Sequence, residues 1–212
     1  MRPGAEKSGC GTLDNVLSNR YTGSVRHLEV CMASFRSKIA AAALAATVGG
    51  STQALALPTV GDAMPEGKVE DADGKTLETK SIKGKPLLIV YEDRDTATQN
   101  SELKKELSEL AKGDKYKSKI ALAAVADVTA YDFWPVKGFV KDAIREESKK
   151  VGTTIYCDWT GSFRKAFKLS QGKSSVVLVG KDGKIVFAGE GKLSADDRKK
   201  LLALLKTQVE GS

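Results

Sequence analysis

Residues 86–111 read PLLIVYEDRDTATQNSELKKELSELA, and this stretch predicts a buried strand followed by an amphipathic helix. Five consecutive apolar residues, Leu87 to Tyr91, are bounded by turn-forming and polar residues, which is typical of a short central strand buried on both faces. Asn100 or Ser101 can cap the helix that follows, in which leucines recur at three- and four-residue spacing. Strand then helix is the first half of a β-α-β unit, so the stretch indicates an α/β fold.

The rest of the chain continues this alternation. Further strands are expected at residues 119–125, 153–157, 176–179 and 185–188, with Pro135 opening one helix and Ser194, in a capping box with Asp197, opening the last. The last two strands flank the turn at Asp182-Gly183 and form an antiparallel hairpin. Residues 69–77 contain an earlier turn at Asp73-Gly74, which predicts an N-terminal hairpin. We therefore expect a central mixed β-sheet with helices on both faces.

The beginning of the chain resembles an export signal that starts at Met32. Arg36 and Lys38 precede the apolar stretch 39–48, and small residues ending in Ala54-Leu55-Ala56 form a signal-peptidase site. We therefore interpret residues 32–56 as a signal peptide, cleaved between Ala56 and Leu57. A signal peptide normally begins the chain, so we expect translation to start at Met32. Residues 1–31 are then interpreted either as a mis-annotated or disordered extension of the reading frame or as a long n-region. Residues 57–212 are then the mature domain, outside the cytoplasm.

Removal of residues 1–56 changes which kinds of chemistry are available. Cys10, Cys31 and His27, the only histidine, fall in the removed part, which leaves Cys157 as the only cysteine. Histidine-dependent triads, histidine metal sites and an internal disulfide are thereby excluded from the mature chain. No metal and no cofactor is expected.

The charge pattern gives no indication of nucleic-acid binding or of a membrane span after cleavage. Residues 1–56 carry six of the 34 basic and three of the 27 acidic residues, so the net charge falls from +7 to +4. The remaining lysines alternate with acids, as in Lys104-Lys105-Glu106, which is typical of a solvated helix face.

Three segments carry a resemblance to known families. The entry from Leu57 to Tyr91 resembles the redoxin and TlpA-like exported branch of thioredoxin-like proteins. Residues 136–150 and 174–194, the latter including the run SSVVLVGKDGKI, are similar to the YtfJ family of small exported bacterial proteins. The resemblance implies a thioredoxin-like fold and an extracytoplasmic location, but no established activity.

This sequence departs from the active thioredoxin pattern in two places. The Cys-x-x-Cys pair of a thioredoxin follows the first central strand at a helix N-terminus, where the thiol pKa is lowered. Here Asp95 to Gln99 fall at that place, with Thr96 and Gln99 in the two cysteine positions. Ser174 stands where the fold normally has a cis-proline, and a cis bond before serine would be costly. We therefore predict that dithiol chemistry is absent.

Cys157 is the one candidate for residual thiol chemistry. Thr154 and Cys157 match the Thr-x-x-Cys spacing of peroxiredoxins, whose cysteine instead follows the first central strand. Cys157 ends the third expected strand among apolar residues, where burial would raise the pKa of the thiol. The preferred interpretation is a small buried core residue, and a one-cysteine thiol peroxidase or oxidoreductase is the alternative.

Other polar and aromatic candidates have ordinary structural explanations. The acids Glu92, Asp93 and Asp95 could hold a hard cation, but acids near a helix N-terminus are more often a solvated loop. Trp134 and Trp159 fall in loops on either side of the third expected strand. Either could be a binding platform, although packing over a sheet edge is the commoner role.

Three functions remain open. The leading interpretation is a non-enzymatic binding or scaffold module of the cell envelope that holds an envelope protein or peptide in the groove near Asp95, Thr96, Gln99 and Ser174, by addition of an extended chain to the sheet. The second is the thiol enzyme that works through Cys157. The third is a purely structural domain of a larger envelope assembly.

The export hypothesis predicts one definite terminus. Intact mass of the protein recovered from the envelope fraction should correspond to a chain that begins at Leu57, because the Ala54-Leu55-Ala56 site precedes it. Recovery from that fraction of a chain that still begins at Met1 or Met32 would contradict the hypothesis.

Overall fold

The computed structural model describes residues 57–112, 116 and 118–211, which lie within one compact unit, Thr52–Ser212. The interpretations placed on residues 1–31 and 32–56, including Cys10, Cys31, His27 and Ala56, lie outside the described residues. Within the described part, no helix is both long enough and apolar enough to cross a bilayer.

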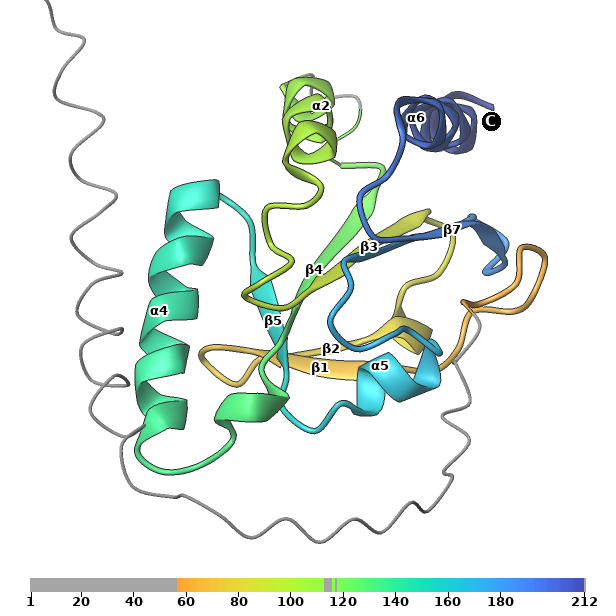
Figure 1. Ribbon diagram of the computed structural model, residues 1–212. Coiled ribbons are helices and arrows are strands. Elements are labelled where there is room, and N and C mark those ends of the chain that lie inside the picture. Colours follow the sequence, from red (N-terminus) through yellow and green to blue (C-terminus); the bar gives the residue numbers. More distant parts are fainter. Residues whose placement is uncertain (1–56, 113–115, 117, 212) are drawn as a thin grey trace, which may run out of the picture. The chain divides into compact units, whose positions relative to one another are not determined.

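A single mixed sheet of seven strands forms the centre of the domain (Figure 1). The spatial order of the strands is β2-β1-β5-β4-β3-β6-β7. Strands β3, β4 and β5 are mutually parallel, and the other neighbouring pairs are antiparallel. The strands are β1 (Lys68–Asp71), β2 (Thr76–Glu78), β3 (Leu87–Glu92), β4 (Ala121–Asp127), β5 (Ile155–Asp158), β6 (Ser175–Val179) and β7 (Ile185–Glu190). The predicted mixed sheet is confirmed.

Strand β3 is central because it is apolar on both faces. All six of its residues are buried, and it pairs with β4 on one side and β6 on the other. Leu87, Ile89 and Tyr91 contribute to one core cluster, whereas Leu88 contributes to the cluster on the opposite face. A continuous apolar run therefore became a strand covered from both sides, as the sequence predicted.

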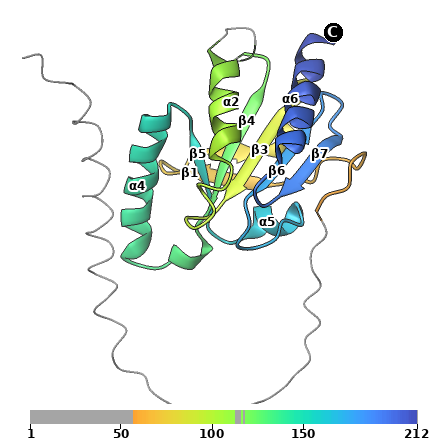
Figure 2. The same ribbon diagram turned by 45° about the horizontal axis from the view of Figure 1, so that its top comes forward.

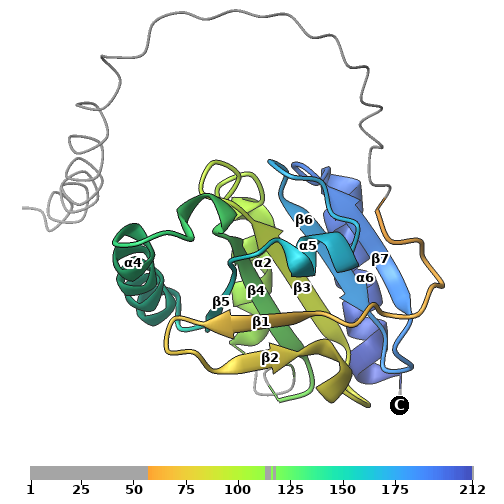
Figure 3. The same cartoon turned by 90° about the horizontal axis from the view of Figure 1, so that it is seen from below.

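Helices cover both faces of the sheet. Figure 2 shows α2 (Ser101–Ala111) and α6 (Ala195–Glu210) against one face, and their leucines pack there on β3, β6 and β7. Helix α4 (Val136–Val151) lies beside β5, with Val140 and Ile144 packed near Cys157. Figure 3 shows the short helix α5 (Ser162–Ala166) on the opposite face, where Phe163 stacks on Phe167 at 4.6 Å between ring centroids.

The N-terminal hairpin extends the sheet on the far side of β5. Gly74 occupies the turn with φ +86°, which glycine adopts without steric cost, and its N–H donates to the carbonyl of Asp71. Strand β1 then pairs antiparallel with β5, and not only with β2. A short 3-10 helix, η2 (Thr79–Ser81), leads from the hairpin toward β3.

The helix ends agree with most of the predicted signals. Pro135 stands at the start of α4, and Ser194 accepts from the Asp197 N–H at the start of α6, as expected. Asn100 also stands at the start of α2, but its side chain makes no capping bond. The capping expectation for Asn100 is wrong, because that side chain is used in a long-range contact described below.

Candidate functional site

The place of the thioredoxin cysteine pair is a series of turns, and not the first turn of a helix. Residues 93–100 separate β3 from α2, which begins only at Ser101. The Gln99 N–H donates to the Thr96 carbonyl at 2.9 Å, so the two positions lie across one turn. Thr96 and Gln99 are therefore close together, and their placement at the two cysteine positions stays a prediction.

Asp93 organises the start of this loop. Its Oδ1 accepts hydrogen bonds from the N–H groups of Asp95 and Thr96, at 3.0 and 2.8 Å, and from the Thr96 hydroxyl at 2.8 Å. Thr96 is 2% exposed, so its hydroxyl closes the turn from inside and does not point to solvent. Asp95 is exposed and Gln99 is partly exposed. Of the loop's predicted binding residues, these two are accessible from outside.

Ser174 lies behind the loop, just before β6, and is completely buried. Its hydroxyl donates to Glu92 Oε1 at 3.0 Å and accepts from Asn100 Nδ2 at 2.8 Å. A serine hydroxyl bonded to a carboxylate resembles half of a nucleophilic pair, but a nucleophile must reach its substrate. With no exposed surface, Ser174 acts here as a bridge between β3 and the start of α2.

Glu92 brings a carboxylate into this interior. Burial raises the pKa of its carboxyl group, while the Lys104 ammonium, which pairs with Oε2, and the Ser174 hydroxyl lower it in part. Lys104 also donates to the carbonyl of Ala97 at 2.6 Å, so it ties the loop to α2. A buried carboxylate persists only where such donors satisfy it.

Asn100 is a site residue that the sequence analysis missed. Besides bonding Ser174, its Nδ2 donates to the carbonyl of Gly191 at 2.9 Å, and its Oδ1 accepts from the Leu193 N–H at 2.9 Å. It thus connects the start of α2 to the segment between β7 and α6. An asparagine before a helix is normally interpreted as a cap, and no local pattern distinguishes a partner more than 90 residues away.

A second group of buried polar side chains joins the carboxyl ends of β3, β4 and β5. Tyr91 Oη donates to Asp158 Oδ2 at 3.1 Å, and Arg164 Nε lies 3.3 Å from Asp127 Oδ2. Asp127 and Asp158 are direct neighbours in the parallel pairing of β4 and β5. Burial and the two aspartate charges raise the pKa of Tyr91 far above its ordinary value. Tyr91 therefore stays protonated and serves as a donor that holds the strand ends together.

Cys157 occupies the interior beneath α4. It is 1% exposed and packs with Val128, Trp159 and residues of α4. Burial raises the pKa of its thiol to about 11, with a smaller contribution from the Glu70 charge. The thiol is therefore almost entirely protonated at neutral pH, and a protonated thiol is a poor nucleophile.

The two tryptophans have opposite environments. Trp159 is 6% exposed and packed, with Lys137 Nζ 4.5 Å from its ring centroid, so packing is confirmed for this residue. Trp134 is 91% exposed, so the packing role expected for it is wrong. Phe133 and Phe139 beside it are also largely exposed. These three exposed aromatic side chains lie close together in the chain, between the end of β4 and the fourth residue of α4.

The acidic residues do not form a metal-binding cluster in the described part of the chain. Glu92 and Asp93 are engaged in the internal bonds given above, and Asp95 is solvated. Asp71 Oδ1 accepts from the N–H groups of Asp73 and Lys75 in the hairpin turn. The solvated position expected for Glu92 is therefore wrong, because its carboxylate is buried and internally bonded, whereas Asp95 is exposed as expected.

Comparison with known protein families matches residues 68–208 to a model described as a bacterial protein of unknown function, YtfJ_HI0045. The chain belongs to this family. The match covers every strand and nearly all of α6, so the family resemblance extends over the whole described fold. A search of curated proteins gives no significant match.

Solved structures with a similar backbone are thioredoxin-like. A protein described as a protein disulfide isomerase, from Bacteroides thetaiotaomicron, has TM-score 0.56 and 16% identity over 72% of this chain and 91% of its own. A protein described as the thiol:disulfide interchange protein DsbE, from Chlorobium tepidum, has TM-score 0.52 and 15% identity over 70% and 99%. An uncharacterized conserved protein from Geobacillus kaustophilus has TM-score 0.56 and 17% identity over 72% and 83%. At these identities the similarity shows the fold alone.

The buried Glu92 predicts a specific pH dependence. Because its folded-state pKa is raised, ionised Glu92 destabilises the folded chain, and this cost appears as the pH rises from the ordinary glutamate pKa, about 4.3, to the raised value. Urea unfolding across this interval should show that the wild type loses stability relative to Glu92→Gln, which keeps an acceptor for Ser174. The control Glu109→Gln, on the exposed face of α2, should run parallel to the wild type. A Glu92→Gln curve parallel to the wild type would contradict the raised pKa.

Cys157 should be unreactive in the folded protein. In a chain with Cys10→Ser and Cys31→Ser, maleimide at neutral pH should label Cys157 only after denaturation, because the thiol is buried and protonated. Ser108→Cys on exposed α2, in the same background, should label at once. Cys157→Ala should lower the free energy of unfolding by about 1 kcal/mol through lost packing. Rapid native labelling would favour the thiol-enzyme alternative.

Proposed function

We propose that this chain is an exported thioredoxin-like domain without dithiol chemistry, which binds an envelope protein or peptide at the carboxyl end of its parallel strands. The observation that supports this most is the buried group made by Glu92, Ser174 and Asn100, with which the more exposed Lys104 forms an ion pair. It lies directly behind the loop where a thioredoxin has its cysteine pair. Hydrogen bonds and the Glu92–Lys104 ion pair fix the position of that loop, which has no cysteine pair.

The absence of a cysteine pair at this loop follows from the residues themselves. Thr96 and Gln99 cannot exchange thiols, and a lone cysteine has no partner to resolve a mixed disulfide. Cys157 lies under α4 on β5, away from the loop that follows β3. The oxidoreductase alternative would therefore need α4 to move before any substrate could reach the thiol.

A binding role is supported by what remains exposed at this end of the sheet. Asp95 and Gln99 are accessible on the loop, while Thr96 and Ser174 support it from inside. The exposed side chains of Phe133, Trp134 and Phe139 follow β4, the strand next to β3. Trp134 is the most exposed of them, and tryptophan contributes strongly to affinity at protein interfaces.

An envelope location is supported by the signal-like segment before Leu57. Peptide binding is assigned to the loop after β3, where the exposed Asp95 and the partly exposed Gln99 can contact a partner, and not to the edge strands β2 and β7. A rigid loop suits such a role, because a pre-organised surface loses less conformational entropy when it binds.

Capture of partners tests the proposal. Wild type, Trp134→Ala and Val151→Ala are each cross-linked in an envelope extract, and the bound proteins are quantified. Trp134→Ala should capture a specific partner about tenfold less than wild type, since loss of an aromatic anchor typically costs more than 1 kcal/mol. Val151→Ala removes an exposed apolar side chain at the C-terminal end of α4 and should leave capture unchanged. Equal capture by all three chains would contradict the assignment of this surface.

The same proteins should not reduce insulin. Thr96→Cys combined with Gln99→Cys places two thiols across one turn, at a spacing that allows a disulfide. The double variant should form this disulfide, which thiol counting after denaturation detects. The wild type should not reduce insulin. Insulin reduction by the wild type would contradict the non-redox proposal.

A further inference from the structure

Strand β4 lies inside the sheet, between β5 and β3, but one of its faces is only partly covered. Leu122 on this face is 43% exposed, and Ala124 and Ala126, which share the face because side chains alternate along a strand, are partly buried. Ala123 and Val125 on the other face are buried. Parallel strands are normally covered by helices on both faces. Leu122, Ala124 and Ala126, here called the β4 strip, thus form apolar surface that no element in the described part of the chain fully covers.

The β4 strip is bordered by a helix on each side. Helix α2 packs over β3, where Leu88, the register partner of Leu122, shares a cluster with Leu103. Helix α4 packs over β5, where Val140 lies against the cluster that contains Cys157. Figure 2 shows the two helices apart from each other on the same side of the sheet. The strip therefore lies on the sheet between α2 and α4.

Helix α4 turns an apolar flank toward the β4 strip. None of its 16 residues is buried. One side of the helix faces the N-terminal hairpin, because Arg145 pairs with Asp73 at 2.8 Å. With about 3.6 residues per turn, Val136, Val140 and Ala143 lie on the side away from Arg145, toward β4. Val136 and Val140 are partly buried and Ala143 is exposed, so this flank, like the strip, is apolar and incompletely covered.

Opposite charges stand at the two ends of the space between the helices. Helices α2 and α4 run in the same direction, because each connects two neighbouring parallel strands. Lys104 lies in the first turn of α2, on the side opposite Glu106, which faces α6, and it stays partly exposed although it pairs with Glu92. Glu147 lies near the end of α4 on its apolar flank, and its pairing with Lys150 leaves the side chain 47% exposed.

The face of a sheet suits a helix as occupant better than it suits an extended chain. The hydrogen bonds from β4 to β3 and β5 lie in the plane of the sheet, so the β4 strip offers side chains and no backbone groups. An occupant must therefore satisfy its own backbone groups, as an α-helix does. The small side chains of Ala124 and Ala126 allow such a helix to approach closely. The strip spans about 13 Å, which corresponds to about nine helical residues.

We propose that the β4 strip binds an amphipathic α-helix of another protein, which lies between α2 and α4. Apolar residues of this helix, spaced three or four apart, contact the strip. An acidic residue in its first turn pairs with Lys104, and a basic residue in its last turn pairs with Glu147. The bound helix therefore runs in the same direction as α2 and α4. Its charge order also agrees with the helix dipole, which favours acids at the start and bases at the end.

Two synthetic peptides, held helical by a side-chain staple, test the proposal on the full chain. Both carry leucines at three- and four-residue spacing, and the first has glutamates in its first turn and lysines in its last, whereas the second has the reverse order. The first should bind with a dissociation constant on the order of 100 µM and shift amide signals of β4, α2 and α4. The second should bind about fivefold more weakly, because its charges oppose Lys104 and Glu147. An unstapled form of the first peptide with a central proline should not bind, since it cannot form the helix.

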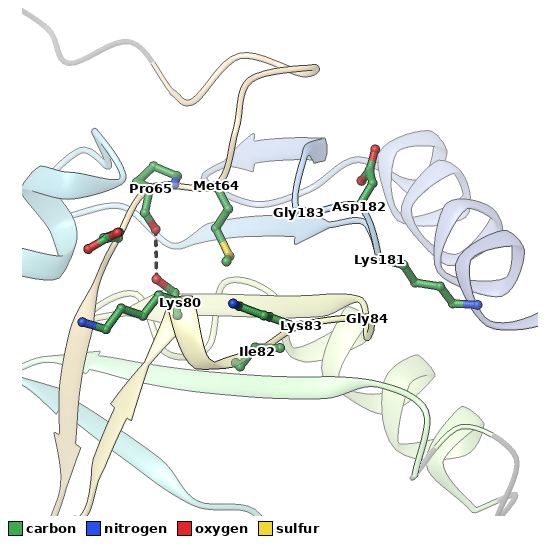
Figure 4. Close-up of a pocket in the computed structure, with 11 residues that line it drawn as sticks. Met64, Pro65, Lys80, Ile82, Lys83, Gly84, Lys181, Asp182 and Gly183 are labelled. Carbon is green, nitrogen blue, oxygen red and sulfur yellow. Dashed lines mark hydrogen bonds between the residues drawn. The ribbon is translucent and has the colours of Figure 1, made fainter.

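A matched pair of variants tests the strip itself. Leu122→Asp should weaken binding of the first peptide at least about tenfold, because a carboxylate enters the apolar contact. The control Val60→Asp changes an apolar residue that is 62% exposed and should bind as the wild type. Val60 lies in the segment that leads to Met64, whose N–H bonds Gly183 in the turn between β6 and β7, away from β4 (Figure 4). Urea unfolding checks that both variants are folded.

Glu147→Lys gives a readout that a structural defect would not produce, and it lies on an exposed helix, so it serves even if Leu122→Asp does not fold. It should weaken the first peptide and strengthen the second, which reverses their order of affinity. Absence of binding at about 1 mM peptide, equal binding of the proline peptide, unchanged affinity of Leu122→Asp, or an unchanged order in Glu147→Lys would each overturn the proposal. The capture experiment above is independent of these outcomes, because it alters Trp134, which precedes α4.

Discussion

The carboxylate of Glu92 enters the interior at the end of β3, and a buried charge must be satisfied by donors that reach it. Lys104 comes from α2 and Ser174 from the start of β6, so both elements are drawn to the same point. Asn100 continues the contact from Ser174 to Gly191 and Leu193, before α6. One costly group thus determines how two helices and two strands meet at this end of the sheet.

The two ends of the sheet consequently differ in character. At the carboxyl end of β3, polar side chains fill the interior and bond to one another, which leaves Asp95, Gln99 and the aromatic side chains of the β4–α4 connection for contact with other molecules. At the amino end, backbone bonds such as that between Met64 and Gly183 join the segment before β1 to the turn between β6 and β7.

Local patterns were sufficient for most of the fold and for part of the site. The uninterrupted apolar run at Leu87–Tyr91 predicted a strand buried on both faces, and the burial of Cys157 followed from its place at the end of a short strand. Asn100 and Trp134 were misinterpreted for the same physical reason. Whether an asparagine caps its own helix or bonds a distant segment, and whether a loop tryptophan packs or projects, depends on neighbours that only the folded chain supplies.

The sequence by itself determined the order of strands and helices, the lack of a cysteine pair after the first central strand, and the family, because these depend on periodicity, residue type and spacing. The tertiary structure alone decided that Ser174 and Thr96 are internal, that Glu92 is a buried carboxylate with a raised pKa, and that Asn100 bonds the segment between β7 and α6. Each of these depends on bringing together residues that are remote in the chain. Burial and electrostatic environment are properties of that three-dimensional neighbourhood, so no local pattern contains them.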